Sequence, residues 1–352
     1  MIDTDVLIVG GGIAGAALGA ALGGKRRTML IEAEDHCGFH STGRSAAFWL
    51  ESYGGASVAP LTRASRRVLA ENGWLTTRGA IHLDHGTGGN AFAALPGLEE
   101  LDRTALEARI PGLRPEWQRG LLEPGCADID VAALHAYCLS RLRAAGGTVR
   151  TGAALGHAER RRGVWHVTLA NAETVTATTV VNAAGAWADE VARRCAVAPL
   201  GITPKRRTMV QLRTGRAGLR NLPLITDVAG GFYFKGESDR SIWLSPHDEV
   251  DCAPCDAAPE EIAIATAIAR FEEVVDWPVE AVERSWAGLR SFSPDRAPVY
   301  GLDPGAQGFF WCVGQGGFGI QTAPAASALA AALLLGETPA HDPSPFDPAR
   351  FS

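Results

Sequence analysis

The 352-residue sequence lacks any surplus of basic residues, because 33 lysines and arginines are opposed by 39 acids and the formal net charge is -6. Phosphate backbones are bound by basic surfaces, so we expect no nucleic-acid partner. The sequence also lacks a long apolar run: the C-terminal "ASALAAALLLG" is too short to span a bilayer. An apolar strand pattern starts almost at the first residue, so we expect a cytoplasmic protein without a targeting or integral membrane segment.

Cysteine is scarce as well. Seven cysteines are spread over the chain, an odd number without framework spacing, which argues against structural disulfides. Cys252 and Cys255 form one CxxC motif, but a zinc ribbon needs a second pair and the sequence has none. We therefore expect no metal site and interpret this motif as a coincidence within a loop.

What the sequence does have is a glycine-rich opening, "VLIVGGGIAGAALGAAL". The apolar run from Val6 to Val9 predicts a strand buried on both faces, and the residues from Ala14 to Leu22 predict the helix that follows. The turn between them has the GxGxxG spacing of a dinucleotide-binding unit, and a second predicted strand, Thr28–Ile31, ends in an acid suited to ribose hydroxyls. The N–H groups at the helix start suit a pyrophosphate. The predicted cofactor contacts here are Gly10, Gly12, Ile13, Ala14, Gly15, Glu32 and Ala33.

FAD and NAD both use this unit, and the opening alone does not distinguish them. The stretch "HSTGRSAA" follows where an NAD domain would normally continue with a strand and a helix. A small, polar loop of this kind can wrap a pyrophosphate, although an ordinary surface loop has the same composition.

Together with the opening, "HSTGRSAA", "VNAAGAWAD", "PKRR", "WAGLRSFSPD" and "GQGGFGIQT" resemble the FAD-dependent D-amino acid oxidase and glycine oxidase superfamily over nearly the full length. Among its members the sequence is most similar to bacterial D-arginine dehydrogenase. The resemblance implies noncovalently bound FAD, since no cysteine precedes the SPD turn, where monomeric sarcosine oxidase attaches its flavin. It also implies further cofactor contacts at Ser41, Thr42, Gly43, Arg44, Ser45, Ala46, Ala47, Ala154, Ala184, Gly185, Gly316, Gly317, Phe318, Gly319, Ile320 and Gln321.

The implied fold class is α/β with an α+β substrate part. A Rossmann-like FAD-binding domain of the glutathione-reductase type would carry an inserted mixed-sheet substrate domain. We expect residues 1–50, 131–200 and 287–346 in the FAD-binding domain, 51–130 and 201–286 in the substrate-binding domain, and 347–352 in a tail.

The resemblance also implies the reaction: oxidation of the Cα–N bond of an amino acid by hydride transfer to flavin N5. The resulting imine would hydrolyse to a 2-oxo acid and ammonia. An arginine fork suits the substrate carboxylate, and Arg290 and Arg207 match the family's substrate-binding arginines. Tyr53 and Tyr233 match substrate-facing tyrosines. The alternative is that the arginines pair with structural acids and that the tyrosines are core aromatics.

Four further positions are assigned to the substrate pocket. Ala80 replaces a glutamate that holds the guanidinium in D-arginine dehydrogenase, and Phe48 replaces a histidine, so we expect a neutral or hydrophobic D-amino acid rather than arginine. His82 could offer a polar contact, although we expect it at the surface, and Gly317 lies beside the flavin.

Other functions share this fold. Glycine, sarcosine or another secondary amine could be the substrate, and a flavin 2-hydroxy acid dehydrogenase would need a base. A noncatalytic flavoprotein and an NAD enzyme are further alternatives. Trp243 aligns with the lysine that promotes oxygen reactivity in sarcosine oxidase, which slightly favours a dehydrogenase. The electron acceptor (oxygen, quinone or another compound) stays open.

Overall fold

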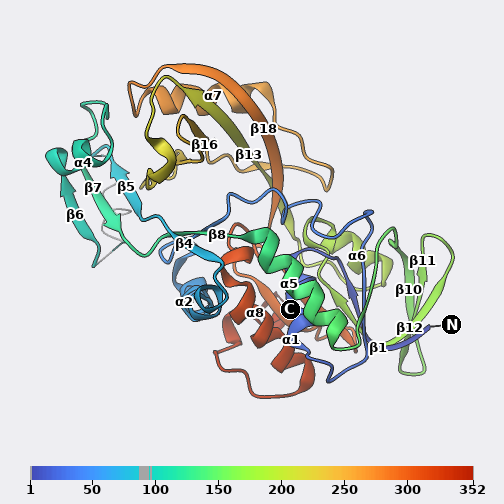
Figure 1. Ribbon diagram of the computed structural model, residues 1–352. Coiled ribbons are helices and arrows are strands. Elements are labelled where there is room, and N and C mark those ends of the chain that lie inside the picture. Colours follow the sequence, from blue (N-terminus) through green and yellow to red (C-terminus); the bar gives the residue numbers. More distant parts are fainter. Residues whose placement is uncertain (1, 87–94, 96, 352) are drawn as a thin grey trace.

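The computed structural model describes residues 2–86, 95 and 97–351, so residues 87–94 and 96 of the expected substrate domain lie outside the described part. A largely parallel sheet contains strands from both the N-terminal and the C-terminal parts of the chain (Figure 1). Its central strand β1 is hydrogen-bonded in parallel to β2 and to β12. Beyond them, β9 and β20 also pair in parallel, whereas β10, β11 and β19 are antiparallel additions. The strands are β10 (Leu155–Arg161), β11 (Val164–Leu169), β12 (Thr174–Asn182), β1 (Ile2–Val9), β2 (Thr28–Ile31), β9 (Thr148–Arg150), β20 (Phe309–Val313) and β19 (Val299–Leu302).

Both faces of this sheet are covered, as the continuous apolar run of β1 predicts. Ile8 packs into a core with helices α1 (Ile13–Ala21), α5 (Val131–Ala144) and α8 (Gly319–Leu335). Leu7 faces a second core, which includes α6 (Ala188–Arg194). The first turn of α1 therefore lies at the carboxyl end of β1, where open α/β sheets bind ligands.

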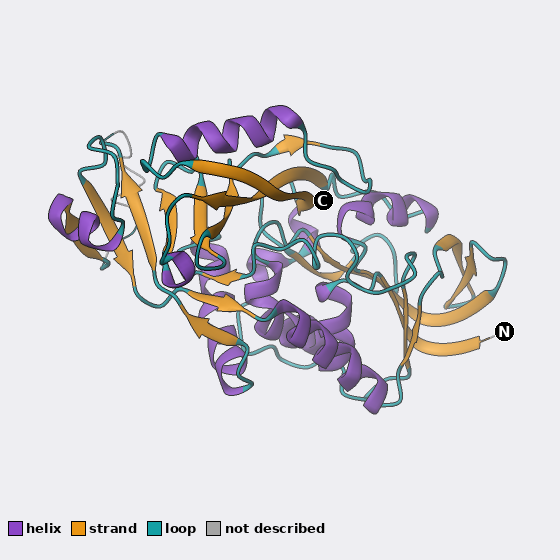
Figure 2. Ribbon diagram, turned by 45° about the horizontal axis from the view of Figure 1, so that its top comes forward, coloured by secondary structure: helices purple, strands orange, loops and turns teal. Residues whose placement is uncertain are grey.

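A second, mixed sheet forms the other half of the molecule (Figure 2). Its strands in order are β17 (Val250–Asp251), β13 (Thr203–Thr214), β16 (Ser241–Ser245), β15 (Tyr233–Gly236), β14 (Leu224–Asp227), β5 (Ala80–Asp84), β7 (Arg119–Glu123) and β6 (Glu99–Asp102), with β18 (Val279–Phe292) also paired to β13. Residues of α7 (Glu261–Glu272) and α4 (Arg103–Arg109) contribute to the core of this half. The long β13 and β18 extend from this sheet toward the first one (Figure 1).

Smaller elements join the two halves. A three-stranded sheet contains β3 (Phe48–Trp49), β8 (Ala127–Ile129) and β4 (Leu75–Thr77). Short 3-10 turns are η1 (Gly185–Trp187), η2 (Leu219–Asn221), η3 (Ser344–Phe346) and η4 (Pro348–Phe351). In the described part of the chain, no helix has the length and apolar character needed to cross a membrane.

The architecture confirms the expected fold class. Within this architecture, α2 (Gly55–Glu71) lies against α8. Leu61 and Leu69 of α2 belong to the same core as α1 and α5. The sequence showed that α2 is amphipathic but not which layer its apolar face joins.

Candidate active site

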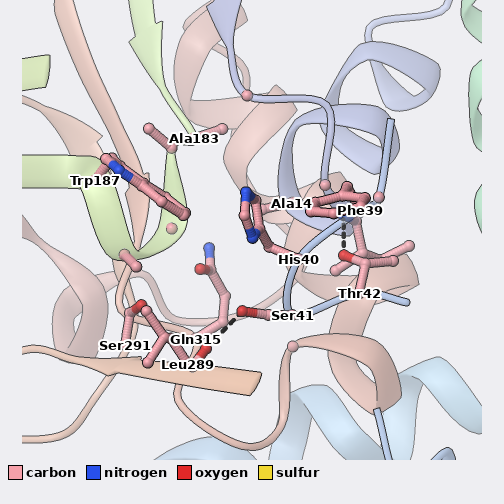
Figure 3. Close-up of a pocket in the computed structure, with 18 of the residues that line it drawn as sticks. Ala14, Phe39, His40, Ser41, Thr42, Ala183, Trp187, Leu289, Ser291 and Gln315 are labelled. Atoms are coloured by element: carbon pink, nitrogen blue, oxygen red, sulfur yellow. Dashed lines mark hydrogen bonds between the residues drawn. The ribbon is translucent and has the colours of Figure 1, made fainter. Parts of the chain in front are cut away.

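A cavity of about 360 Å³ lies between the two sheets, at the carboxyl ends of β1 and β2 (Figure 3). Most of the predicted cofactor residues and both arginines line it. These residues are Gly10, Gly12, Ile13, Ala14, Glu32, Ala33, Ser41, Thr42, Arg44, Ser45, Ala46, Ala154, Ala184, Gly185, Gly316, Gly317, Gly319, Ile320, Arg207 and Arg290. Ten other predicted residues do not line it: Gly15, Gly43, Ala47, Phe318, Gln321, Tyr53, Tyr233, Phe48, Ala80 and His82.

The glycine turn after β1 has the close contacts that the motif predicts. Gly10 has a φ of 112°, and a Cβ there would overlap the carbonyl oxygen of Ala183. A Cβ at Gly15 would overlap the Gly10 carbonyl oxygen, so this glycine acts in packing rather than in lining the cavity. Gly12 is less crowded, with only the Thr42 hydroxyl at 3.3 Å from such a Cβ. The space over Gly12 therefore stays free for a ligand.

Glu32 lies at the end of β2 and lines the cavity. Its Oε2 accepts the N–H of Gly11 at 2.7 Å, and its Oε1 accepts the N–H of Glu34 at 3.0 Å. These bonds fix the carboxylate where ribose hydroxyls of a dinucleotide would reach it. The buried His135, which sequence reasoning missed, donates from Nε2 to the Gly11 carbonyl at 2.8 Å. Burial lowers the pKa of His135, so the ring supports the turn as a neutral donor.

The loop from Ser41 to Ala47, called the flavin loop below, is tied to both sides of the cavity (Figure 3). The Thr42 hydroxyl accepts the N–H of Ile13, at the start of α1, at 2.9 Å. The Ser41 hydroxyl donates to the Leu289 carbonyl of β18 at 2.5 Å. The loop thus connects the glycine turn with the strand that carries Arg290.

Two other predicted cofactor contacts, Gln321 and Gly43, bond to the protein itself. Gln321 accepts the N–H of Leu50 at 3.2 Å and donates to the Tyr53 carbonyl at 3.1 Å and to the Thr62 hydroxyl at 3.0 Å. The N–H of Gly43 donates to the Gly38 carbonyl at 2.9 Å. Gln321 thus holds the chain that follows the flavin loop, Gly43 bonds within the turn that begins the loop, and neither lines the cavity.

Sequence reasoning missed several lining residues. His40 and Trp187 have ring centroids 4.5 Å apart on the cavity wall (Figure 3). His40 directly precedes the flavin loop, and Trp187 lies within "VNAAGAWAD", so the motifs held the signal. Gln315 before α8 also lines the cavity and lies within "GQGGFGIQT", whereas no spacing in the sequence indicated Met209 on β13.

Arg290 of β18 is held by two phenols and by no carboxylate. Its Nη1 donates to the Tyr53 hydroxyl at 2.9 Å, and its Nη2 to the Tyr233 hydroxyl at 3.4 Å. No acid among the described residues lies within ion-pair distance of its guanidinium. Burial alone would lower the pKa of Arg290, but the tyrosines and Glu249 reverse this effect and raise it. A charged fork therefore faces the cavity without a neutralising partner.

Arg207 lies on the same face of the neighbouring strand β13, opposite Gly288, while Arg290 is opposite Lys205. Its Nε donates to the Asp248 carbonyl at 2.7 Å, and its Nη2 lies 3.2 Å from Glu249 Oε1. Its Nη1 is buried without a hydrogen-bond partner. Burial and the nearby Arg290 lower the pKa of Arg207. This side chain therefore has the acidic partner that the structural alternative expects, and one N–H edge remains for a ligand.

Aromatic rings surround the Arg290 fork. Phe48 has its ring centroid 6.1 Å from that of Tyr53 and 5.6 Å from that of Tyr233. Gly317 closes the other side, since a Cβ there would overlap the Tyr53 hydroxyl and lie 3.0 Å from Arg290 Nη1. The structure thus brings together Arg290, both tyrosines, Phe48 and Gly317.

His82 corrects one expectation, because it is buried rather than at the surface. Its Nε2 lies 2.9 Å from Glu123 Oε2, which also accepts the Ser52 hydroxyl at 2.7 Å. Glu123 Oε1 accepts the N–H groups of Glu51 and Ser52 at 2.9 and 3.2 Å. Burial alone would raise the pKa of Glu123, but the bonds from His82 and Ser52 lower it. Ala80 is fully buried and pairs with Glu123 across the strands. Neither His82 nor Ala80 reaches the cavity.

Sequence reasoning also missed His247. Its ring centroid lies 5.7 Å from that of Tyr233, and its Nδ1 donates to the Gly230 carbonyl at 2.7 Å. Burial and the charge of Arg207 lower the pKa of His247 to about 4. The ring is therefore neutral at pH 7 and supports Tyr233 from behind.

Comparison with known proteins gives the class to which this fold and cavity belong. A family model described as FAD dependent oxidoreductase (DAO) matches residues 5–333, and the chain belongs to this family. FAD fits this cavity. The GxGxxG turn, the acid at the end of β2 and the polar flavin loop all border it, and the loop is hydrogen-bonded to both α1 and β18.

Three relatives illustrate the likeness. Glycine oxidase of Pseudomonas aeruginosa is 32% identical over 177 residues, which is 48% of this chain and 45% of the relative. The bifunctional protein ThiO/ThiG of Synechocystis is 25% identical over 369 residues, 99% of this chain and 54% of the relative. The chain thus spans about half the length of these curated relatives. The crystal structure of glycine oxidase from Geobacillus kaustophilus superposes with a TM-score of 0.85 at 22% identity and covers 99% of this chain and 98% of that one.

Proposed function

We propose that the chain oxidises the Cα–N bond of a D-amino acid with a neutral or hydrophobic side chain. FAD, when bound, supplies the two-electron acceptor for this reaction. The products would be an imine, which hydrolyses to a 2-oxo acid and ammonia. The observation that carries the proposal is the Arg290 guanidinium, which faces the cavity and, within residues 2–86, 95 and 97–351, bonds to two tyrosine hydroxyls and has no acidic partner.

The chain's own residues bind and orient the substrate. The Arg290 fork would donate two parallel hydrogen bonds to the substrate carboxylate, and Nη1 of Arg207, which has no hydrogen-bond partner among the described residues, would donate a third. Tyr53 and Tyr233 keep the fork in place. With its carboxylate held at Arg290, the rest of the substrate would extend into the cavity, which Gly316 and Gly317 line and where FAD would accept the two electrons.

The surroundings of the arginine support a neutral substrate side chain. Phe48, Tyr233, Met209 and Ala80 belong to one apolar cluster beside the fork. Glu123 lies directly opposite Ala80 on the paired strand β7, but each of its two carboxylate oxygens already accepts two hydrogen bonds. It offers no free carboxylate to a cationic side chain, and an unpaired charge there would cost about 1.5 to 3 kcal/mol.

A second candidate is the oxidation of glycine, sarcosine or another small secondary amine. The observation that favours it is the likeness to glycine oxidases, both in sequence and in fold. The same arginine fork would serve these substrates, because all of them carry a carboxylate.

We further propose that the electron acceptor is a compound other than oxygen. Trp243 stands at the position where a lysine promotes oxygen reactivity in sarcosine oxidase. It packs on Trp286, with ring centroids 5.2 Å apart, in the apolar cluster that includes Ala46 of the flavin loop.

The test is anaerobic mixing of the purified protein with D- and L-amino acids, glycine, sarcosine, D-proline and 2-hydroxy acids, followed by flavin absorbance. We expect bleaching with a neutral D-amino acid and slow recovery in air. Bleaching by glycine or sarcosine alone would support the second candidate. Bleaching by a hydroxy acid and by no amine would refute both.

Two variants test the role of Arg290 in the same assay. Arg290→Lys keeps the charge but loses the fork, so the apparent dissociation constant of the substrate should rise by about 10- to 100-fold. The matched control is Arg67→Lys on α2, whose side chain is 83% exposed. An unchanged constant in Arg290→Lys would contradict the assignment.

A further inference from the structure

The CxxC motif, which the proposed function does not use, is a pair in space. Cys252 Sγ and Cys255 Sγ lie 3.6 Å apart. A disulfide bond needs a separation of about 2.05 Å, so the two sulfur atoms would have to approach each other by roughly 1.5 Å to form one. Cys255 is exposed and Cys252 is half-buried, so a small oxidant reaches the pair. Four of the other cysteines are buried, and Cys37 is half-buried.

The two cysteines belong to a segment, residues 252–257, that holds the flavin loop. Asp256 lies 2.5 Å from Arg44 Nη2, and the Ala257 carbonyl accepts Arg44 Nη1 at 2.9 Å. Arg44 in turn lines the cavity. The other end of the segment is anchored, because the N–H of Cys252 donates to the Pro204 carbonyl of β13 at 3.0 Å.

This arrangement couples the sulfur atoms to the cofactor cavity. Asp256 directly follows Cys255, so a movement of Cys255 toward the anchored Cys252 displaces the carboxylate that holds Arg44. Cys252 also packs against an apolar cluster that includes Ala257 and Leu289, and Trp187 packs against the same cluster. Both Leu289 and Trp187 line the cavity. A change in the segment therefore reaches two walls of the site.

We propose that Cys252 and Cys255 form a reversible thiol–disulfide site, and that its oxidation loosens the hold of residues 256–257 on Arg44 and weakens FAD binding. The proposal does not depend on the substrate, because it concerns only the cofactor that the family binds.

The chemistry balances with a small disulfide such as glutathione disulfide as the oxidant. The Cys255 thiolate attacks one sulfur of the oxidant, forms a mixed disulfide and releases one glutathione. Cys252 then attacks the mixed disulfide and releases the second glutathione. The two protein thiols lose two protons and two electrons in total, and the oxidant gains them as two thiols.

The surroundings of Cys255 set the conditions for this reaction. Burial, the hydrogen bond with Cys252 and the charge of Asp256 raise the pKa of Cys255. The thiolate is the attacking species, so the test is best made at mildly alkaline pH.

The experiment treats the FAD-loaded protein with glutathione disulfide and measures its mass. We expect a loss of two hydrogen atoms and a linked peptide containing residues 252 and 255, both reversed by dithiothreitol. The dissociation constant of FAD, from ultrafiltration of oxidised and reduced protein, should be about three- to tenfold higher after oxidation, the effect of weakening one partly exposed charged hydrogen bond.

Four variants act as controls. When reduced, Cys252→Ser and Cys255→Ser should bind FAD like the reduced parent. With the oxidant neither should form an internal disulfide, and Cys252→Ser should stop at the mixed disulfide. Cys37→Ser should respond like the parent. Asp256→Asn should weaken FAD binding even when reduced, and oxidation should then add little. In the parent protein, a mixed disulfide without the internal bond would overturn the proposal. So would an oxidised protein with an unchanged FAD dissociation constant.

Discussion

The substitution Gly317→Ala tests the geometry around Arg290 most directly. The new Cβ would overlap the Tyr53 hydroxyl and lie 3.0 Å from Arg290 Nη1. The φ of Gly317 is not in the left-handed region, so the backbone accepts alanine and only the side-chain clash matters. Overpacking of this kind costs about 1 to 3 kcal/mol. The hydroxyl is the atom that must move, so its bond to Arg290 should break.

The partner substitution is Tyr53→Phe, which removes the hydroxyl and with it a hydrogen bond to a charged group. This loss costs about 1.5 to 3 kcal/mol, which corresponds to a dissociation constant for a bound carboxylate that is about 10- to 150-fold higher. In Gly317→Ala/Tyr53→Phe the clash is largely relieved, although the ring carbon Cζ of residue 53 stays 3.0 Å from the new Cβ. The double variant should therefore bind almost as well as Tyr53→Phe alone.

The assay is the dissociation constant of benzoate, read from the change in flavin absorbance, with thermal unfolding as the measure of fold. Gly305→Ala is the matched control, because a Cβ there meets only Asp303 Oδ1, at 3.5 Å. A coupling energy of at least about 1 kcal/mol between the two substitutions is expected. Additive effects, with a coupling below about 0.5 kcal/mol, would refute the contact between residues 317 and 53.

Three further predictions concern the supports of the site. Glu123→Gln weakens the bonds that hold the chain before Tyr53, so the free energy of unfolding in urea should fall by about 1 to 3 kcal/mol, whereas the exposed Glu99→Gln should be neutral. His247 has a folded pKa of about 4, below its unfolded value of 6.5, so its contribution to stability is present above pH 6.5 and is lost as pH falls toward 4. This loss is at most about 3 kcal/mol, and His247→Gln should flatten the stability curve in that window; parallel curves would contradict the shift. Gly12→Ala should fold like the parent but bind FAD more weakly, because the new Cβ meets only the Thr42 hydroxyl, at 3.3 Å, whereas Gly12 lines the cavity; equal FAD affinity would show that the cofactor does not approach this turn.

The cofactor end of the cavity could be predicted from the sequence because its determinants are local. Gly10, Gly12 and Glu32 lie within one strand, turn, helix and strand, and their spacing alone places them at one edge of the sheet. The flavin loop was predicted through a family motif, and five of its seven residues line the cavity, where Thr42 bonds to α1 and Ser41 bonds to β18.

The supports of the substrate end could not be predicted in the same way, since they depend on contacts between distant segments. Glu123 reaches Ser52 across 71 positions, and His82 reaches Glu123 across 41. A histidine in a short strand is ordinarily expected at the surface. Only the pairing of β5 with β7, which no spacing in the sequence encodes, reveals that it is buried.

The two arginines show the same limit most clearly. Arg207 and Arg290 occupy the same face of two paired strands, and both match family positions, yet their surroundings differ. The turn that follows β16 brings Asp248 and Glu249 against Arg207, whereas the tyrosines of β15 and of the segment before α2 meet Arg290. Arg207 is thus largely neutralised by its neighbours, and Arg290 is not. Because a substrate carboxylate is attracted to the uncompensated charge, Arg290 should contribute more to affinity, and a lysine at position 207 should be tolerated better than one at position 290.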